Sequence, residues 1–150
     1  MLEYNSTLMV TVLRKEYPEI ADIIAERIKK TLPEEKLDDL CHISEIVETF
    51  KRDKGICLVS WTNRKSNYNR ELLIAVMLMF YHPEKLLQLT TSRSKFGMLK
   101  QLSKLIGSSQ PILSGDLANA IVAFKAYDKF RKEVYRIYEI IKTENNFFTT

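Results

Sequence analysis

Glycine, proline, cysteine and histidine are all scarce in this sequence, which has four, four, two and two of them among 150 residues. So few glycines and prolines exclude collagen-like and low-complexity chains. Two cysteines, Cys41 and Cys57, are too few for a disulfide framework. The longest apolar run, residues 72–81, is ten residues long, whereas a membrane span needs about 20. The N-terminus also lacks the basic and apolar regions of a secretory signal, so we expect a cytoplasmic protein that does not enter a membrane.

Signatures of catalysis and metal binding are missing as well. The sequence contains no GxGxxG, P-loop, GxSxG or HExxH pattern. Cys41, His42, Cys57 and His82 are the residue types that bind zinc, but their spacing matches no CxxC or HxxxH motif. We therefore expect no enzyme, no metal site and no cofactor.

Charge is distributed unevenly along the chain, although its net value is only +4. Residues 1–57 contain nine Lys and Arg against twelve Asp and Glu, and residues 58–150 contain fourteen against seven. We expect an acidic N-terminal part and a basic C-terminal part, divided near Gly55 and packed together as one domain. A basic surface suggests an acidic partner, and nucleic acid is the commonest such partner.

Hydrophobic periodicity predicts an all-α protein, a compact bundle of about six or seven helices. Pro18 fits the first turn of a helix whose isoleucines recur on one face. A second helix is expected from Pro33 to a C-cap at Gly55. One short extended segment is possible at Ile56–Ser60, where the apolar run is too short to distinguish strand from helix.

The central part of the chain predicts a buried helix, because residues 72–81 carry no polar side chain on any face. Asn69 is a suitable N-cap for it. Pro83 disfavours helical geometry at His82 and starts another helix. A helix, a short turn and a second helix are expected at residues 98–122, followed by one long helix or two in tandem.

Residues 99–117 read LKQLSKLIGSSQPILSGDL. Gly107 can adopt the positive φ that a tight turn between helices requires, and the hydroxyl of Ser109 can cap the second helix. An apolar seam between the helices would come from Leu102, Ile106, Leu113 and Leu117. This pattern resembles the helix-turn-helix of repressor-type DNA-binding domains, in which LAxxLG is followed by VSQ.

The resemblance implies that the first helix supports a second one whose N-terminal side chains enter the DNA major groove. The expected base contacts are Ser109, Gln110, Pro111 and Ser114. Gln110 suits adenine best, because its amide can form two hydrogen bonds with that base. The expected phosphate contacts are Arg93, Lys95, Lys100 and Lys104. Further cations extend this surface near the C-terminus, although some of them must point elsewhere on a helix, namely Lys125, Lys129, Arg131, Lys132 and Arg136.

The segment departs from the family pattern at Gly115 and Asp116, inside the second helix, where no Lys or Arg lies between Gln110 and Ala123. Two interpretations follow. In the first, the protein is a DNA-binding regulator of transcription or another DNA transaction, and a homodimer contacts two half-sites of duplex DNA. In the alternative, the protein is an all-α protein–protein interaction module, and the helical hairpin has only a structural role.

Overall fold

The computed structural model describes residues 6–55, 66–90, 93 and 97–148. These residues form eight α-helices and one short 3-10 helix, with no strand among them. The prediction of an all-α protein is confirmed, with one or two helices more than expected. The extended segment expected at residues 56–60 lies outside the described residues. The chain divides into two compact units, residues 1–34 and 35–150, so the charge boundary near residue 57 falls within the larger unit.

The smaller unit contains helices α1 (Ser6–Glu16) and α2 (Pro18–Thr31). Pro18 is in the first turn of α2, as expected, because its missing N–H would be unpaired there in any case. Tyr17 joins the two helices: its N–H donates to the carbonyl of Leu13, and its carbonyl accepts from the N–H of Ala21. None of the side chains described from Leu8 to Glu34 is buried.

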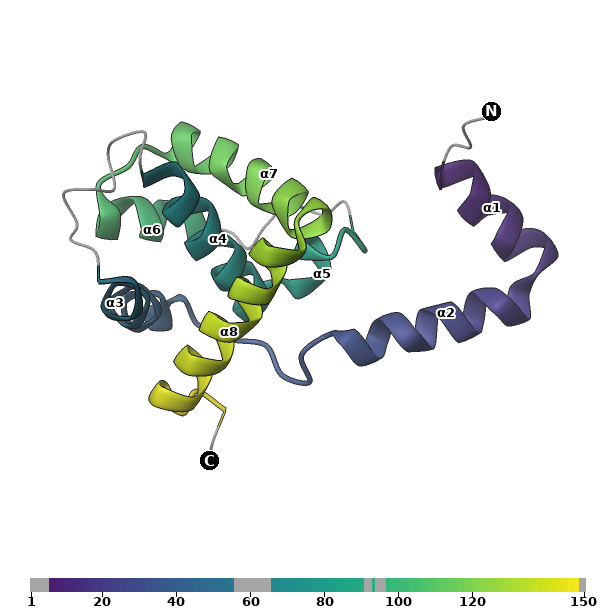
Figure 1. Cartoon of the computed structure of the whole chain (residues 1–150), viewed down its shortest axis with the longest axis horizontal. Helices are drawn as coiled ribbons and strands as arrows, with labels where there is room; N and C mark the ends of the chain where they lie inside the picture. Colours follow the sequence, from purple (N-terminus) through teal and green to yellow (C-terminus); the bar gives the residue numbers. More distant parts are fainter. Residues whose placement is uncertain (1–5, 56–65, 91–92, 94–96, 149–150) are drawn as a thin grey trace. The chain divides into compact units, whose positions relative to one another are not determined.

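The larger unit is built around one apolar helix. Its elements are the 3-10 helix η1 (Leu40–His42), α3 (Ile43–Lys54), α4 (Asn67–Tyr81), α5 (Pro83–Leu86), α6 (Met98–Ile106), α7 (Gln110–Ala126) and α8 (Asp128–Asn145). Every side chain from Leu72 to Phe80 is fully buried, because α4 packs against α3, α5, α7 and α8. Figure 1 shows α4 at the centre of this unit. The core helix predicted at residues 72–81 is therefore present.

The chain between Pro33 and Asp39 is not helical, although a helix was expected to begin there. The N–H of Leu37 donates to the carbonyl of Phe80 at 2.8 Å, and the hydroxyl of Tyr81 donates to the carbonyl of Asp39 at 2.7 Å. Both bonds fasten this segment to the C-terminal end of α4. These long-range hydrogen bonds and the burial of Leu37 thus outweigh the local preference for a helix that begins at Pro33.

The other helix ends agree only in part with the ends predicted from the sequence. Gly55 ends α3 in the left-handed conformation, at φ 65°, as its lack of a side chain allows. Helix α4 begins three residues earlier than expected, with Ser66 and not Asn69 at its N-cap. Tyr127 separates α7 from α8 with an extended φ of −116° and ψ of 110°, so the last apolar stretch forms two helices in tandem.

Candidate nucleic-acid interface

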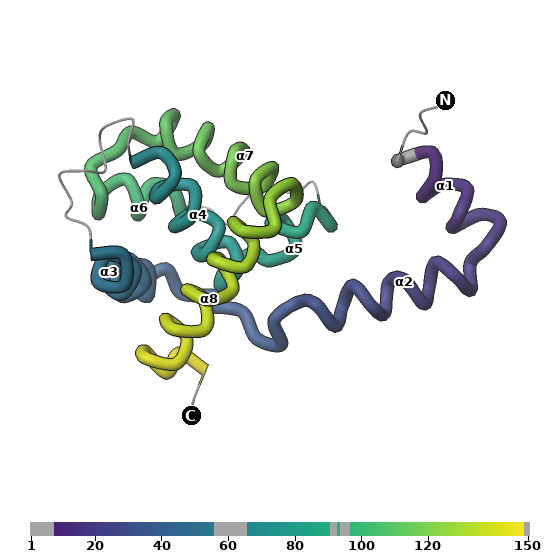
Figure 2. Tube along the Cα trace, viewed as in Figure 1, coloured from purple at the N-terminus to yellow at the C-terminus, as the bar shows by residue number. Residues whose placement is uncertain are grey.

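Helices α6 and α7 are joined by the tight turn that the sequence predicts. Gly107 has a φ of 76°, a conformation that strains residues with a side chain. Its N–H donates to the carbonyl of Ser103 at 2.9 Å. The hydroxyl of Ser103 in α6 donates to the carbonyl of Ser108 at 2.6 Å. This hydrogen bond links the end of α6 to the residue that follows Gly107. Figure 2 follows the chain from α6 through this turn into α7.

The start of α7 differs from the expectation in one respect. Ser109 occupies the N-cap position, but its hydroxyl makes no capping hydrogen bond. Its backbone carbonyl instead accepts from the N–H of Leu113 at 3.1 Å. Pro111 lies in the first turn, where proline favours the helical φ and needs no hydrogen-bond donor. The proline and the turn therefore define this helix end without a side-chain cap.

The expected seam between the two helices is buried. Leu102 and Ile106 from α6 and Leu113 and Leu117 from α7 all belong to the hydrophobic core. Because these positions face inward, α6 packs against α7 and α3, and α7 packs in turn against α4. A rigid support of this kind is what a surface helix needs to present side chains to a ligand.

The four residues expected to contact bases are all exposed. Ser109, Gln110, Pro111 and Ser114 are open to solvent at the N-terminal end of α7, while Leu113 between them is buried. The amide of Gln110 is therefore accessible to a ligand.

The cations expected to contact phosphates are exposed wherever the structure describes them. Lys100 and Lys104 lie one turn apart on α6, and Arg93 precedes that helix. Lys95 lies outside the described residues. The side chains of Lys100 and Lys104 make no ion pair with a described residue, so both ammonium groups are available to an external anion.

Asp116, one of the two residues at which the segment departs from the helix-turn-helix pattern, is buried and does not lie on the surface of α7. Only 6% of this residue is exposed, and its Oδ2 accepts from Nε of Arg70 at 2.7 Å. Arg70 is 5% exposed and also donates to the side-chain oxygen of Asn67. The carboxylate therefore points into the core and fastens α7 to α4. No sequence pattern indicated this pair, because its partners are 46 residues apart.

Glu71 is adjacent to this buried pair. Burial and the nearby negative charge of Asp116 raise its pKa above the usual value. A side-chain hydrogen bond with Asn119 of α7 acts in the opposite direction. Arg70 and Glu71 thus place two polar links between α4 and α7, one to the buried Asp116 and one to the exposed Asn119.

Three of the five cations predicted near the C-terminus form ion pairs within the protein. Arg131 donates to the carbonyl of Phe124 and pairs with Asp128, and Lys132 pairs with the same carboxylate at 2.9 Å. Arg136 bonds to Asp53 through two nitrogens. Only Lys125 and Lys129 of these five are exposed without an ion-pair partner among the described residues. Three of the five cations are therefore engaged in ion pairs, and the helical spacing had already implied that some of the five point away from the basic surface.

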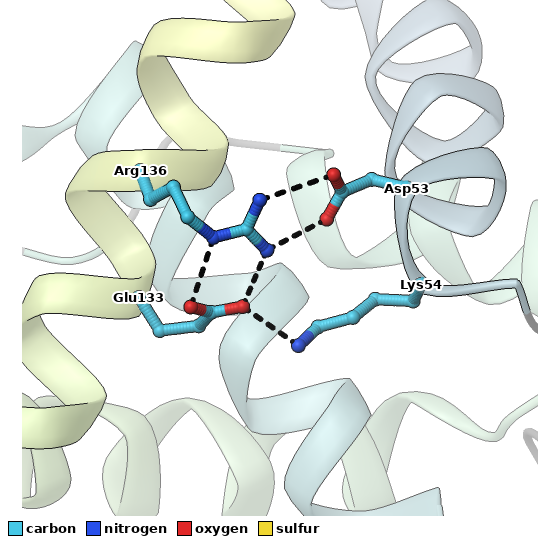
Figure 3. Close-up of polar contacts among 4 residues, drawn as sticks. All are labelled: Asp53, Lys54, Glu133 and Arg136. Atoms are coloured by element: carbon cyan, nitrogen blue, oxygen red, sulfur yellow. Dashed lines mark hydrogen bonds and ion pairs between the residues drawn. The ribbon is translucent and has the colours of Figure 1, made fainter.

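Arg136 belongs to a four-residue network between α3 and α8 (Figure 3). Its guanidinium bridges Asp53 and Glu133, and Lys54 donates to Glu133 at 2.8 Å. The hydrogen bonds from Arg136 and Lys54 lower the pKa of Glu133 to about 2. The same bonds with the two carboxylates raise the pKa of Arg136. These charges join two helices and are not available to bind phosphate.

No group of three or more potential metal ligands is present within the described ranges. Cys41 is exposed, whereas Cys57 lies outside those ranges. Nor does any helix in the described part of the chain have the length and apolar character to cross a membrane.

Comparison of the chain with models of protein families, with curated proteins and with solved structures gives no match.

Proposed function

We propose that the protein binds duplex DNA through α6, the turn at Gly107 and the N-terminal half of α7. One observation carries this proposal: Asp116 is the only carboxylate between Glu84 and Asp128 in the sequence, and it is buried against Arg70. The stretch from Lys85 to Gly115 contains five lysines and arginines and no acidic residue. A surface with exposed cations and no exposed carboxylate attracts a polyanion.

The proposed roles follow from the chemistry of each side chain. Gln110 forms two hydrogen bonds with an adenine edge in the major groove. Ser109, Pro111 and Ser114 contact neighbouring base edges. Lys100 and Lys104 neutralise phosphates and set the position of the helices on the duplex. Because one such motif seldom gives tight specific binding, a homodimer on two half-sites is part of this proposal.

The first test is binding to random-sequence duplex DNA at several salt concentrations. If roughly six phosphates are neutralised, the logarithm of the association constant should fall with log salt at a slope near −5. The measurement is fluorescence anisotropy of a labelled duplex between ~50 and ~200 mM salt. Absence of binding at ~50 mM salt would contradict the proposal.

Two variants separate base contacts from phosphate contacts. Gln110→Ala should cost about 1–3 kcal/mol on a selected site and little on random DNA. Lys100→Ala should weaken both duplexes about equally and reduce the salt slope by about one unit. Lys132→Ala is the matched control, since it removes the same charge from a side chain paired with Asp128. Equal losses in Lys132→Ala and Lys100→Ala would mean that net charge alone, and not α6, determines binding.

A protein–protein interaction module is the second candidate, and it is favoured by apolar side chains on α7. Ile112 and Val122 are 51% and 59% exposed, and Gly115, Ala118 and Asn119 between them are exposed and uncharged. A partner helix can pack on such a face. Failure to bind DNA together with retention of the fold would favour this function.

A further inference from the structure

A cavity of about 340 Å³ lies in the larger unit, where side chains of α4, α7 and α8 meet. It is lined by residues of these three helices and by the residue between α7 and α8, namely Tyr68, Glu71, Ala123, Tyr127, Lys129 and Phe130. Its volume falls at the lower end of the range of about 300–1,000 Å³ that is typical of small-molecule sites. The lining includes none of the residues proposed above to contact DNA bases or phosphates.

Three aromatic side chains form walls of this cavity. The rings of Tyr68 and Phe130 are nearly perpendicular, with an interplanar angle of 82° and centroids 5.9 Å apart. Phe130 belongs to the hydrophobic core, whereas Tyr68 and Tyr127 are 47% and 64% exposed. The face of an aromatic ring carries partial negative charge and attracts a cation. Two exposed rings beside a buried one therefore favour an organic cation as the occupant.

Glu71 contributes a negative charge to the same cavity. It lies three residues after Tyr68 in α4, so the two side chains are on one face of that helix. Its carboxylate forms no ion pair with a described residue, since the neighbouring Arg70 is bound to Asp116 at 2.7 Å. Burial and the charge of Asp116 raise the pKa of Glu71. A cation beside this carboxylate would offset both effects.

Lys129 contributes a positive charge. It is exposed in the first turn of α8, and its ammonium group has no ion-pair partner in the described part of the chain. Glu71 and Lys129 thus line one cavity without pairing with each other. A simple cation would be attracted by Glu71 but repelled by Lys129, whereas a ligand that carries both charges is complementary to both side chains.

We propose that this cavity binds a small zwitterion, with a methylated ammonium group between the aromatic rings and Glu71 and an anionic group paired with Lys129. A methylated ammonium group suits these walls, because it is attracted by its charge and does not depend on hydrogen-bond acceptors, which ring faces do not provide. The side chain of Glu71 keeps its hydrogen bond with Asn119. Phosphocholine is a probe with this chemistry.

Titration of the full chain with phosphocholine, followed by isothermal calorimetry, should give saturable binding with a dissociation constant below ~1 mM. Choline lacks the anionic group and inorganic phosphate lacks the cation, so each should bind roughly 10-fold more weakly or not at all. Absence of saturable phosphocholine binding, or equal affinity for either fragment, would overturn the proposal.

Charge variants test the two ends of the ligand. Glu71→Gln keeps the size of the side chain and should weaken phosphocholine binding roughly 10-fold. Glu139→Gln, at an exposed position outside the cavity, is the matched control and should bind as the wild type does. Lys129→Gln should weaken phosphocholine binding without weakening choline binding. Wild-type affinity in Glu71→Gln or Lys129→Gln would contradict the assigned roles.

Ring variants test the aromatic walls. Tyr127→Ala should weaken binding of phosphocholine and of choline roughly 10-fold, whereas Tyr127→Phe keeps the ring face and should bind normally. Tyr17→Ala is the matched control, because Tyr17 is 54% exposed and lies outside the cavity. Circular dichroism checks that each variant is folded. Normal binding by folded Tyr127→Ala would overturn the cation–ring contact.

Vesicles of phosphatidylcholine distinguish the source of the ligand. Co-sedimentation of the wild type but not of Glu71→Gln would assign the cavity to a lipid headgroup. Binding of free phosphocholine without co-sedimentation would assign it to a free zwitterion. None of these measurements contains DNA, so their outcome and that of the DNA-binding proposal are independent.

Discussion

At the scale of single residues, the orientation of Asp116 determines the charge of the proposed interface. A carboxylate on the outer face of α7 would repel phosphate. On the inner face it requires a compensating cation, because burying an unpaired charge is costly. Arg70 provides that cation at 2.7 Å. The same pair thus removes a negative charge from the surface and fixes α7 against α4.

Replacing Asp116 by alanine should reduce the free energy of unfolding by about 3–5 kcal/mol, because Arg70 then remains buried without the carboxylate that neutralises its charge. The double variant Arg70→Met with Asp116→Leu should recover much of this loss, since apolar side chains of similar volume need no charge compensation. Urea denaturation followed by circular dichroism measures both. Asp128→Ala is the control: its carboxylate is 64% exposed in its pair with Lys132, so its effect on stability should be much smaller than that of Asp116→Ala. A similarly small effect at Asp116 would contradict the structural role assigned here.

At the scale of helices, the network of Asp53, Lys54, Glu133 and Arg136 joins α3 to α8 and makes that contact depend on pH. The folded protein holds the pKa of Glu133 at about 2, below its usual value of 4.5. A carboxylate with a lowered pKa stabilises the fold above its unfolded pKa, and this stabilisation is lost as the pH falls toward the folded value.

Glu133→Gln should therefore lower the free energy of unfolding by about 1–3 kcal/mol at pH 7, because two charge-assisted hydrogen-bond partners lose their acceptor charge. The difference between variant and wild type should shrink as the pH falls from about 4.5 to about 2. Urea denaturation at pH 7, 4 and 2 provides the comparison. Glu139→Gln, at an exposed position on the same helix, should change stability by no more than about 0.5 kcal/mol at any of these pH values. A constant difference across the pH range would show that the charge of Glu133 is not what stabilises the contact.

Helix ends were predictable where one residue determines them and unpredictable where a distant contact does. Pro18 and the glycines at 55 and 107 have chemistry that acts locally, and each lies where the sequence predicted. The segment after Pro33 was predicted wrongly, because its backbone bonds to the end of α4, more than 40 residues away. The break at Tyr127 has neither glycine nor proline; there Arg131 donates to the carbonyls of Phe124 and Lys125 at the end of α7.

The candidate site shows the same division between local and distant causes. The alternation of buried and exposed positions from Leu102 to Leu117 followed from helical periodicity, and the positive φ of Gly107 followed from the need for a tight turn. The inward orientation of Asp116 did not follow, since it depends on an arginine from another helix. The pairing of Arg136 with Asp53 was hidden for the same reason. Arg131 and Lys132, in contrast, pair with Asp128 three and four residues earlier on the same helix, a spacing that is visible in the sequence.

At the scale of the whole molecule, the buried core and the exposed apolar helices belong to different units. The hydrophobic core begins at Leu37 and contains no residue from the smaller unit. Residues 1–34 carry five lysines and arginines against six acidic residues, so they add little to the attraction of a polyanion. The larger unit therefore contains both the core and the cations of the proposed DNA-binding surface.

Deletion of residues 1–34 should leave both folding and DNA contact intact. The remaining chain should unfold cooperatively, with a free energy within about 1 kcal/mol of the full chain measured as a monomer, because no core side chain is removed. Its affinity for random duplex DNA and its salt slope per protomer should be unchanged. Urea denaturation and an anisotropy titration of the random duplex measure these quantities. A truncated chain that unfolds without cooperativity would mean that the N-terminal helices complete the core, and weaker binding to random DNA would mean that they contribute to the DNA-binding surface.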